Sequence, residues 1–304
     1  MKYILEIENL EKRYGKFKVI NKLDMHIKKG SIYGLIGKNG AGKTTLIRII
    51  CGLQKPTSGK YFIYGVSNES SEISRSRQRI GAIIEIPSLC LDMTAEDNLK
   101  KQCKIVGVPN YNNLHNILKT VKLDNTGKKK VKNFSLGMKQ RLGIAIALVG
   151  NPDFIILDEP INGLDPEGII EIRELILKLN KENGITFLIS SHYLDELSKI
   201  ATCYGFINNQ KIIKEISQQE LEQNFRKKTQ IIISNLEECI KYLEEIKIPY
   251  KIISDKVVEI YEKFNISELV TALSKRKCIV NAFKEQEETL ESYYLNLIGG
   301  AENV

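Results

Sequence analysis

A glycine-rich loop between an apolar run and a helical run constrains this 304-residue chain more than any other feature of its sequence. The pattern G-x-x-x-x-G-K-[ST] is matched in full by Gly37-Lys38-Asn39-Gly40-Ala41-Gly42-Lys43-Thr44. An apolar run at residues 32–36 precedes the loop and a helical run at residues 45–51 follows it, as a phosphate-binding loop requires. The alternative is a glycine-rich turn that happens to precede a helix, and the complete match in this context disfavours it.

The loop predicts contacts with the phosphates of a nucleotide. Glycines let backbone N–H groups face an anion, and the helix N-terminus adds positive potential. Lys43 is expected to reach the β- and γ-phosphates of ATP, and the Thr44 hydroxyl is expected to ligate Mg²⁺. The expected nucleotide-binding residues of this segment are Gly37, Lys38, Asn39, Gly40, Ala41, Gly42, Lys43, Thr44 and Thr45.

A pair of acids follows the apolar run at residues 154–157. Such a run is typical of a strand buried on both faces of a parallel sheet, and these sheets bind ligands at the carboxyl ends of their strands. Asp158 is expected to hold Mg²⁺, and Glu159 is expected to orient or deprotonate the attacking water. An acidic pair at a strand end is more often merely solvated, but the phosphate-binding loop upstream favours the catalytic interpretation.

A third motif opens the helical run that precedes this strand. Ser135 is a suitable N-cap, and Gly137 allows a close backbone approach. Taken alone, the segment Phe134-Ser135-Leu136-Gly137-Met138-Lys139-Gln140-Arg141 indicates no more than a capped helix. Its position, in which Ser135 lies 23 residues before Asp158, indicates a functional motif rather than a capped helix alone.

The order of apolar runs predicts an α/β fold with a P-loop NTPase core, in which a parallel sheet carries an antiparallel β-flank and an inserted helical lobe at about residues 87–150. The strands of this core are expected at residues 3–7, 19–27, 31–36, 60–63, 80–84, 154–157 and 186–190. Residues 211–304 are expected to form a small α+β module with a β-α-β-β-α-β order. Its strands are expected at residues 231–234, 250–253, 257–261 and 278–283, and its helices at 236–246, 266–275 and 288–298.

Composition places the chain among soluble globular proteins, because 42% of its residues are hydrophobic and 27% are charged. The best apolar run, at residues 142–149, is far shorter than the ~18 residues of a spanning helix, and no signal peptide is visible. Six cysteines without a C-x-x-C pair fit a reducing cytosol rather than a zinc site. The lysine-rich run at residues 128–132 indicates a solvated loop, because no aromatic residues interleave with it as in a nucleic-acid platform.

Over residues 1–210 the chain resembles the ATP-binding subunits of ABC transporters. The motif that starts at residue 134 is similar to the signature motif of that family, roughly L-S-G-G-Q, from which it departs at three positions while keeping Ser135 and Gly137. In the family this helix N-terminus completes the ATP site of the opposite subunit. The resemblance therefore implies that Ser135 and Gly137 contact a nucleotide held by a second copy.

Three further elements resemble the same family. Residues 162–165 are similar to its D-loop, which implies that Asp165 lies at the nucleotide site. His192 follows the apolar run at residues 186–190 and resembles the switch histidine that contacts the γ-phosphate. Tyr14 resembles the aromatic residue that stacks on adenine. Taken alone, His192 would be interpreted as a surface or core histidine without a catalytic role, and Tyr14 as a residue that packs against its neighbours.

One departure from the family concerns the loop after the strand expected at residues 80–84. The family usually carries Gln there, where it meets Mg²⁺ and the attacking water and senses the membrane partner, whereas this chain carries Glu85. With this glutamate, its signature motif and its C-terminal extension, the chain resembles the subgroup that exports bacitracin-type and lantibiotic peptides or confers immunity to them. The alternative is that Glu85 is a neutral exchange that preserves length and reach.

The resemblance implies an ATP-hydrolysing subunit that powers export of, or immunity to, an antimicrobial peptide. Two copies are expected to bind ATP and Mg²⁺ between them as a homodimer, to act with transmembrane permease subunits encoded separately, and to lie on the cytoplasmic face of the membrane. The helical lobe is expected to receive the coupling helices of the permease, and nucleic acid is not expected as a partner.

Two alternatives to a transport subunit fit the same motifs less well. One is a soluble ABC-type ATPase that acts as a clamp on ribosomes or DNA, which the single P-loop and the lack of a heptad run disfavour. The other is a regulatory protein that uses ATP only as a ligand, which Glu159 argues against.

Overall fold

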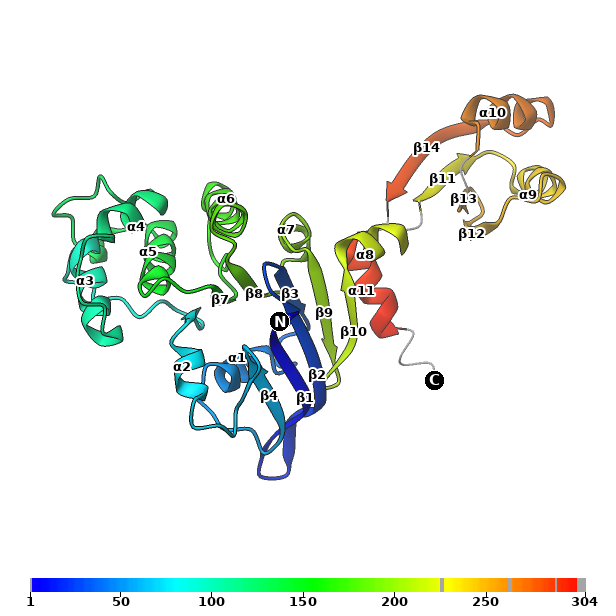
Figure 1. The fold of residues 1–304 in the computed structure, drawn as a ribbon. Coiled ribbons are helices and arrows are strands. Elements are labelled where there is room, and N and C mark those ends of the chain that lie inside the picture. Colours follow the sequence, from blue (N-terminus) through cyan, green and yellow to red (C-terminus); the bar gives the residue numbers. More distant parts are fainter. Residues whose placement is uncertain (1, 225–226, 262–263, 288, 300–304) are drawn as a thin grey trace. The chain divides into compact units, whose positions relative to one another are not determined.

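The computed structural model describes residues 2–224, 227–261, 264–287 and 289–299 of the chain. The chain divides into two compact units, Met1–Gln218 and Gln219–Val304 (Figure 1). Each unit contains an apolar core of its own.

A six-stranded sheet forms the centre of the first unit. Its strand order is β10 (Lys211–Ser217), β9 (Cys203–Asn208), β3 (Ile32–Ile36), β8 (Thr186–Ser191), β7 (Phe154–Asp158) and β6 (Ile80–Ile83). The strands from β9 to β6 run parallel, whereas β10 pairs antiparallel with β9. Every residue of β3, β7 and β8 is buried, as their apolar runs predict for strands covered on both faces. The carboxyl ends of these three parallel strands therefore lie at one edge of the sheet.

An antiparallel sheet flanks this core, as the sequence predicts. Its strand order is β2 (Phe17–Lys28), β1 (Tyr3–Tyr14), β4 (Ser58–Ile63) and β5 (Val66–Ser67). Helix α1 (Lys43–Ile50) shares one apolar core with both sheets through buried side chains such as Leu5, Ile47 and Phe154. Because α1 is anchored on its apolar face, the glycine-rich loop that precedes it is held against the edge of the parallel sheet.

Strands β9 and β10 were not among the strands expected from the sequence. In the structure Glu215 of β10 accepts hydrogen bonds from the Tyr33 hydroxyl at 2.7 Å and from the His26 N–H at 2.9 Å. Gly205 of β9 makes room for this contact, since a Cβ there would lie 1.9 Å from the Tyr33 hydroxyl oxygen. These long-range contacts attach β10 to the first unit, which continues to Gln218 and so extends beyond residue 210, where the sequence suggested a boundary.

The inserted lobe is helical, as expected. It contains α3 (Ala95–Val106), α4 (Leu114–Thr120), a short 3₁₀ helix (Val131–Asn133) and α5 (Leu136–Leu148). Thr94 caps α3 by accepting the Asp97 N–H, and Ser135 caps α5 by accepting the Met138 N–H. The remaining helices of the unit are α2 (Ile73–Arg77), α6 (Pro166–Asn183) and α7 (Leu194–Ser198). In Figure 1 the helices α3, α4 and α5 gather on one side of the unit.

The second unit has the expected β-α-β-β-α-β order. Its elements are α8 (Gln218–Asn224), β11 (Lys227–Ile233), α9 (Leu236–Glu245), β12 (Tyr250–Ser254), β13 (Val257–Ile260), α10 (Ile266–Lys275), β14 (Val280–Glu287) and α11 (Leu290–Gly299). The sheet is antiparallel, with the strand order β12-β13-β11-β14. The last helix was expected from residue 288, which lies outside the described residues.

Candidate functional site

The glycine-rich loop wraps around the end of the Lys43 side chain. The Lys43 ammonium donates a hydrogen bond to the Gly37 carbonyl oxygen at 2.7 Å, and its side chain is only 7% exposed. Two glycines make this path possible. A Cβ at Gly42, which has a φ of 101°, would lie 2.7 Å from the Val19 carbonyl oxygen, and one at Gly37 would overlap Ile207 of β9. A nearly buried cation inside a loop of this shape favours an anionic ligand.

Asp158 lies at the centre of the site. Its two carboxylate oxygens accept hydrogen bonds from the hydroxyls of Thr44, at 2.8 Å, and of Ser190. The carboxylate is almost fully buried, and within the described part of the chain no cation forms an ion pair with it. A buried carboxylate without a cation beside it is suited to holding a metal ion.

Thr44 and Asp158 together fit Mg²⁺, which prefers hard oxygen ligands and keeps several waters. No group of three or more His, Cys, Asp or Glu side chains that could hold a metal occurs among the described residues. Thr44 and Asp158 are two adjacent oxygen ligands within the described residues, and phosphate and water oxygens would supply the rest of the coordination.

Glu159 joins the loop lysine to His192. One of its carboxylate oxygens lies 3.7 Å from the Lys43 ammonium, and the other lies 2.7 Å from Nδ1 of His192. Because an ionised carboxylate only accepts hydrogen bonds, this contact places the proton of a neutral imidazole on Nδ1 and leaves Nε2 as an acceptor. The backbone of Glu159 is left-handed, with a φ of 51°, and its N–H donates to the carbonyl and hydroxyl oxygens of Ser190, both at 3.1 Å.

Ser190 is a site residue that the sequence analysis missed. It is fully buried, it donates to the Asp158 carboxylate, and it accepts the Glu159 N–H, so it contacts both acids. A signal for it was present in the sequence, because Asp158 and Ser190 end two successive apolar runs. In the structure these two residues are register partners in the parallel pair β7 and β8.

The Glu85 carboxylate does not join this cluster through any contact in the described residues. It is 59% exposed and pairs with the Arg48 guanidinium of α1 at 2.7 Å. Its backbone is left-handed, with a φ of 61°. The metal-binding role expected for Glu85 therefore stays a prediction.

The residues expected to contact adenine or a second copy of the chain are exposed to solvent or have free space beside them. Tyr14 is 48% exposed, its hydroxyl donates to Gln54 at 2.7 Å, and the Lys12 ammonium lies over its ring at 5.0 Å from the centroid. Ser135 is exposed at the start of α5, and a Cβ at Gly137 would meet no atom closer than 3.9 Å. Asp165 caps α6 by accepting the Gly168 N–H. The structure thus brings Lys43, Thr44, Asp158, Glu159 and His192 together, and no hydrogen bond or ion pair of the described residues links Ser135 to them.

The chain is similar to known proteins over nearly its whole length. The family model described as ABC transporter matches residues 20–162. The bacitracin transport ATP-binding protein BcrA of Enterococcus faecalis is 38% identical over 99% of this chain and 98% of its own length. The lantibiotic transport ATP-binding protein SrtF of Streptococcus pyogenes is 48% identical over 70% of this chain and 90% of its own length.

Solved structures of ATP-binding cassettes share the fold of most of this chain. CbiO1 of Clostridium perfringens, part of an ABC transporter complex, has a TM-score of 0.66 and 28% identity, and covers 74% of this chain and 92% of its own. A cassette described as a dimer in a post-hydrolysis state, bound to ADP and Pi, has a TM-score of 0.63 and 25% identity, and covers 70% of this chain and 98% of its own.

Proposed function

The chain belongs to the ATP-binding subunits of ABC transporters, and on that premise we propose that its ATPase activity powers the export of, or immunity to, an antimicrobial peptide. The observation that carries this proposal is the extent of the similarity to bacitracin transport subunits, which spans 99% of this chain and therefore includes the second unit. Glu85, in a loop where the family usually has Gln, supports the same subgroup.

Hydrolysis is an in-line attack of water on the γ-phosphorus of ATP, and catalysis consists mainly of positioning and charge stabilisation. Lys43 binds the β- and γ-phosphates through its ammonium, which already lies inside the loop. Glu159 accepts a proton from the attacking water or orients it, and it is held for this task by His192 on one oxygen and Lys43 on the other. Nε2 of His192 would bind a γ-phosphate oxygen only when it carries a proton of its own, because a neutral ring that donates to Glu159 from Nδ1 has an acceptor at Nε2.

Mg²⁺ would be held by Thr44 and Asp158, and it supplies positive charge to the phosphate oxygens when bound. The chain's own contribution is to fix these two oxygen ligands. The Thr44 hydroxyl sits at the start of α1 and Asp158 at the end of β7, so both depend on elements anchored in the apolar core. Glu85 would add a third oxygen ligand only after leaving Arg48.

A second copy of the chain would complete each ATP site with Ser135 and Gly137, which lie at the open N-terminus of α5. The N–H groups of a helix N-terminus and its positive potential are suited to the γ-phosphate. Asp165 lies at the start of α6 and would contribute at the same interface. The dimeric form of the similar cassette supports this arrangement.

The membrane part of the transporter would be a separate permease. Across the described residues, no helix is long and apolar enough to cross a bilayer. The helical lobe would bind the permease and so hold the protein at the cytoplasmic face of the membrane.

The proposal is tested by cellular resistance to bacitracin and to a lantibiotic. Expression of the chain together with its separately encoded permease is expected to raise resistance to at least one peptide, and Lys43→Ala should abolish the gain because phosphate binding is lost. Equal resistance with and without active protein would overturn the peptide function. Phosphate release by the purified chain measures its ATPase activity independently.

A further inference from the structure

The helix that follows His192 is too short to fix its own orientation. α7 spans Leu194–Ser198, and an isolated helix of so few residues is not stable in water. Its buried residue, Leu197, packs against β3 so closely that a Cβ at Gly34 would lie 2.7 Å from the Leu197 side chain. One apolar contact does not by itself stop α7 from turning, so the orientation of α7 and of the neighbouring His192 depends on further contacts.

An ion pair joins α7 to α6. The Arg173 guanidinium donates a hydrogen bond to one Glu196 carboxylate oxygen at 2.7 Å, and the two side chains are 23% and 24% exposed. The other Glu196 oxygen accepts a hydrogen bond from the Lys199 ammonium at 2.5 Å. The bonds from Lys199 and Arg173 hold the pKa of Glu196 below its ordinary value against the opposing effect of burial, so Glu196 stays charged at neutral pH.

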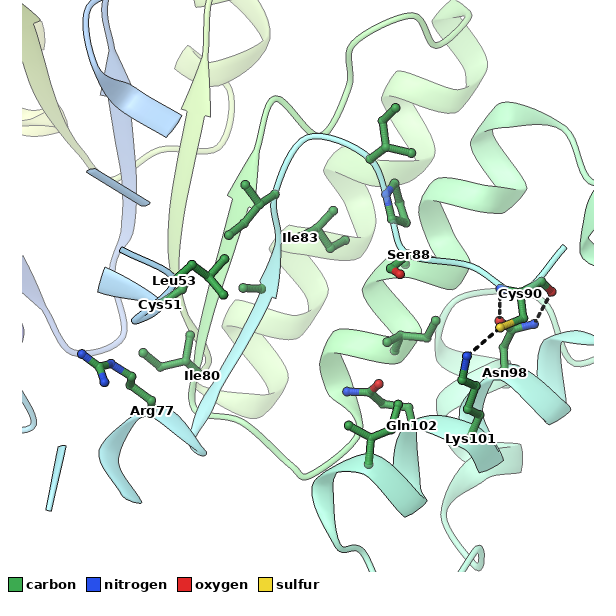
Figure 2. A pocket seen from close by; sticks show the side chains of 17 residues that line it. Cys51, Leu53, Arg77, Ile80, Ile83, Ser88, Cys90, Asn98, Lys101 and Gln102 are labelled. Carbon is green, nitrogen blue, oxygen red and sulfur yellow. Dashed lines mark hydrogen bonds between the residues drawn. The ribbon is translucent and has the colours of Figure 1, made fainter. Parts of the chain in front are cut away.

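The Arg173–Glu196 pair borders a small hollow in the first unit. The hollow has a volume of about 20 Å³, which is room for about one water molecule. Its lining also contains residues beside Glu159 and His192 in the chain, which are Pro160, Ile161 and Ser191. By contrast, the groove beside α3 that Figure 2 shows measures about 450 Å³. The small hollow is therefore suited to holding the loops that border it in place, and not to binding a ligand.

Apolar side chains surround this hollow. Ile169 and Ile176 of α6 and Ile189 of β8 line it together with the Arg173–Glu196 pair. Because both charged side chains are mostly buried beside apolar atoms, water and salt screen their attraction less than that of an exposed pair. The pair is therefore a firm link between α6 and α7.

Building on the proposed function, we propose that Arg173 acts through Glu196 as a positioning residue for His192. The pair fixes α7 on α6, and α7 holds His192 where its Nδ1 lies 2.7 Å from the Glu159 carboxylate. His192 and Glu159 are the groups that the proposed mechanism directs at the γ-phosphate and the attacking water. α6 also begins at Asp165, so a shift of this residue when a second copy binds would reach His192 through the same link.

The test compares two neighbouring residues of α6 by phosphate release from the purified chain. Arg173→Gln should lower kcat by roughly 10–100-fold and leave the KM for ATP within about twofold, because misplaced catalytic groups slow the reaction while the phosphate-binding loop is unchanged. Arg173→Lys keeps the charge and a donor and should recover most of the rate. Glu174→Gln is the matched control, because it removes an exposed ion pair of α6 with Lys122 and should change kcat less than about twofold.

The nuclear magnetic resonance signals of the histidine rings report the position of His192 without turnover. The chain has three histidines, and the other two serve as internal references. In the ATP-free chain, Arg173→Gln should shift the Nδ1 signal of His192, because the hydrogen bond to Glu159 is lengthened. Glu174→Gln should leave this signal in place.

A double-mutant cycle separates the ion pair from the fold. Once Arg173→Gln is made, Glu196→Gln should lower kcat by less than about twofold more, since both changes break the same link. The melting temperature of each variant shows whether it is folded. If Arg173→Gln does not fold, Glu196→Gln alone carries the same two readouts, because it removes the charge and keeps an acceptor for Arg173.

The possible failures are distinct. Either an unshifted His192 signal or a wild-type kcat in Arg173→Gln would overturn the inference and leave the ATPase function intact. Equal losses of rate in Arg173→Gln and Glu174→Gln would also overturn it, because the effect would then belong to α6 as a whole. If the wild-type chain released no phosphate, the proposed function itself would fail, and the His192 signal alone would then decide whether Arg173 positions this ring.

Discussion

The two units of the chain are built from similar elements in different topologies, and the difference explains where the chemistry lies. In the first unit β7 and β8 run parallel, so Asp158 and Ser190 come together at their carboxyl ends. In the second unit every pair among β11, β12, β13 and β14 is antiparallel, and its buried Glu259 lies within the sheet, bound to Gln230 and Tyr261. Parallel strands collect polar side chains at one edge, whereas antiparallel strands distribute their ends over both edges.

The largest expected effect comes from exchanging one acid in each unit. Glu159→Gln should lower the rate of phosphate release by ~10²–10⁴-fold while ATP binding is retained, because the proposed general base is lost. Glu259→Gln is the matched change in the second unit and should leave the rate unchanged. Phosphate release at the wild-type rate in Glu159→Gln would remove Glu159 from the mechanism, and a comparable loss in Glu259→Gln would break the comparison between the units.

A cavity in the second unit should destabilise that unit alone. Leu243 is fully buried in the core that α9 and α10 form with the sheet, so Leu243→Ala should lower the free energy of unfolding by ~2–5 kcal/mol. Hydrogen exchange measured by mass spectrometry should show faster exchange in residues 227–287 and unchanged protection in α1 and β7. Equal loss of protection in both units would show that they unfold together.

Removing the Ser190 hydroxyl should weaken the proposed Mg²⁺ site. Ser190→Ala leaves the Asp158 carboxylate without one of its two donors, so the Mg²⁺ concentration for half-maximal hydrolysis should rise about tenfold, since a hydrogen bond to a charged group is worth ~1.5–3 kcal/mol. Mn²⁺ binding in the presence of ATP, followed by electron paramagnetic resonance, gives a readout that does not depend on turnover. Ser190→Thr keeps the hydroxyl and should restore most of the affinity. Unchanged Mn²⁺ affinity in Ser190→Ala would limit Ser190 to packing.

The smallest expected effect is on the reactivity of one buried cysteine in each unit. Burial raises the pKa of the Cys51 and Cys239 thiols to about 12, so both should react slowly with iodoacetamide at pH 8. The unfolded thiols lose their proton from about pH 9, so the stabilising contribution of each neutral thiol should decline as the pH rises from about 9 to 12. In Leu243→Ala, alkylation of Cys239 should accelerate while that of Cys51 does not. Parallel acceleration at both cysteines would contradict independent opening of the two units.

The sequence predicts those parts of the fold and site that depend on local pattern. The glycine-rich loop, the buried run before Asp158 and the caps at Thr94 and Ser135 each carry their signal within a few residues. Strand β10 carries no such local signal. It is attached to the first unit by hydrogen bonds that Glu215 accepts from Tyr33 and His26, which are far away in the sequence.

The contacts made by Ser190 and Glu85 depend on tertiary structure in the same way. Ser190 reaches Asp158 only because β7 and β8 are neighbours in a particular register. The pair between Glu85 and Arg48 depends on the path of a loop whose backbone is left-handed at Glu85. Neither contact can be derived from propensity or periodicity, since each requires the relative placement of two distant segments.

The position of β3 between β8 and β9 also has a consequence for the order in which the protein is made. The strand that leads into the phosphate-binding loop leaves the ribosome about 150 residues before either of its partners, which at ~5–20 residues per second is a wait of roughly 10–30 s. During that time both edges of β3 are unpaired, and the loop lacks Ile207, which packs against Gly37. Nascent chains shorter than about residue 208 should therefore be unable to retain nucleotide, and this interval is when the growing polypeptide most needs protection from aggregation.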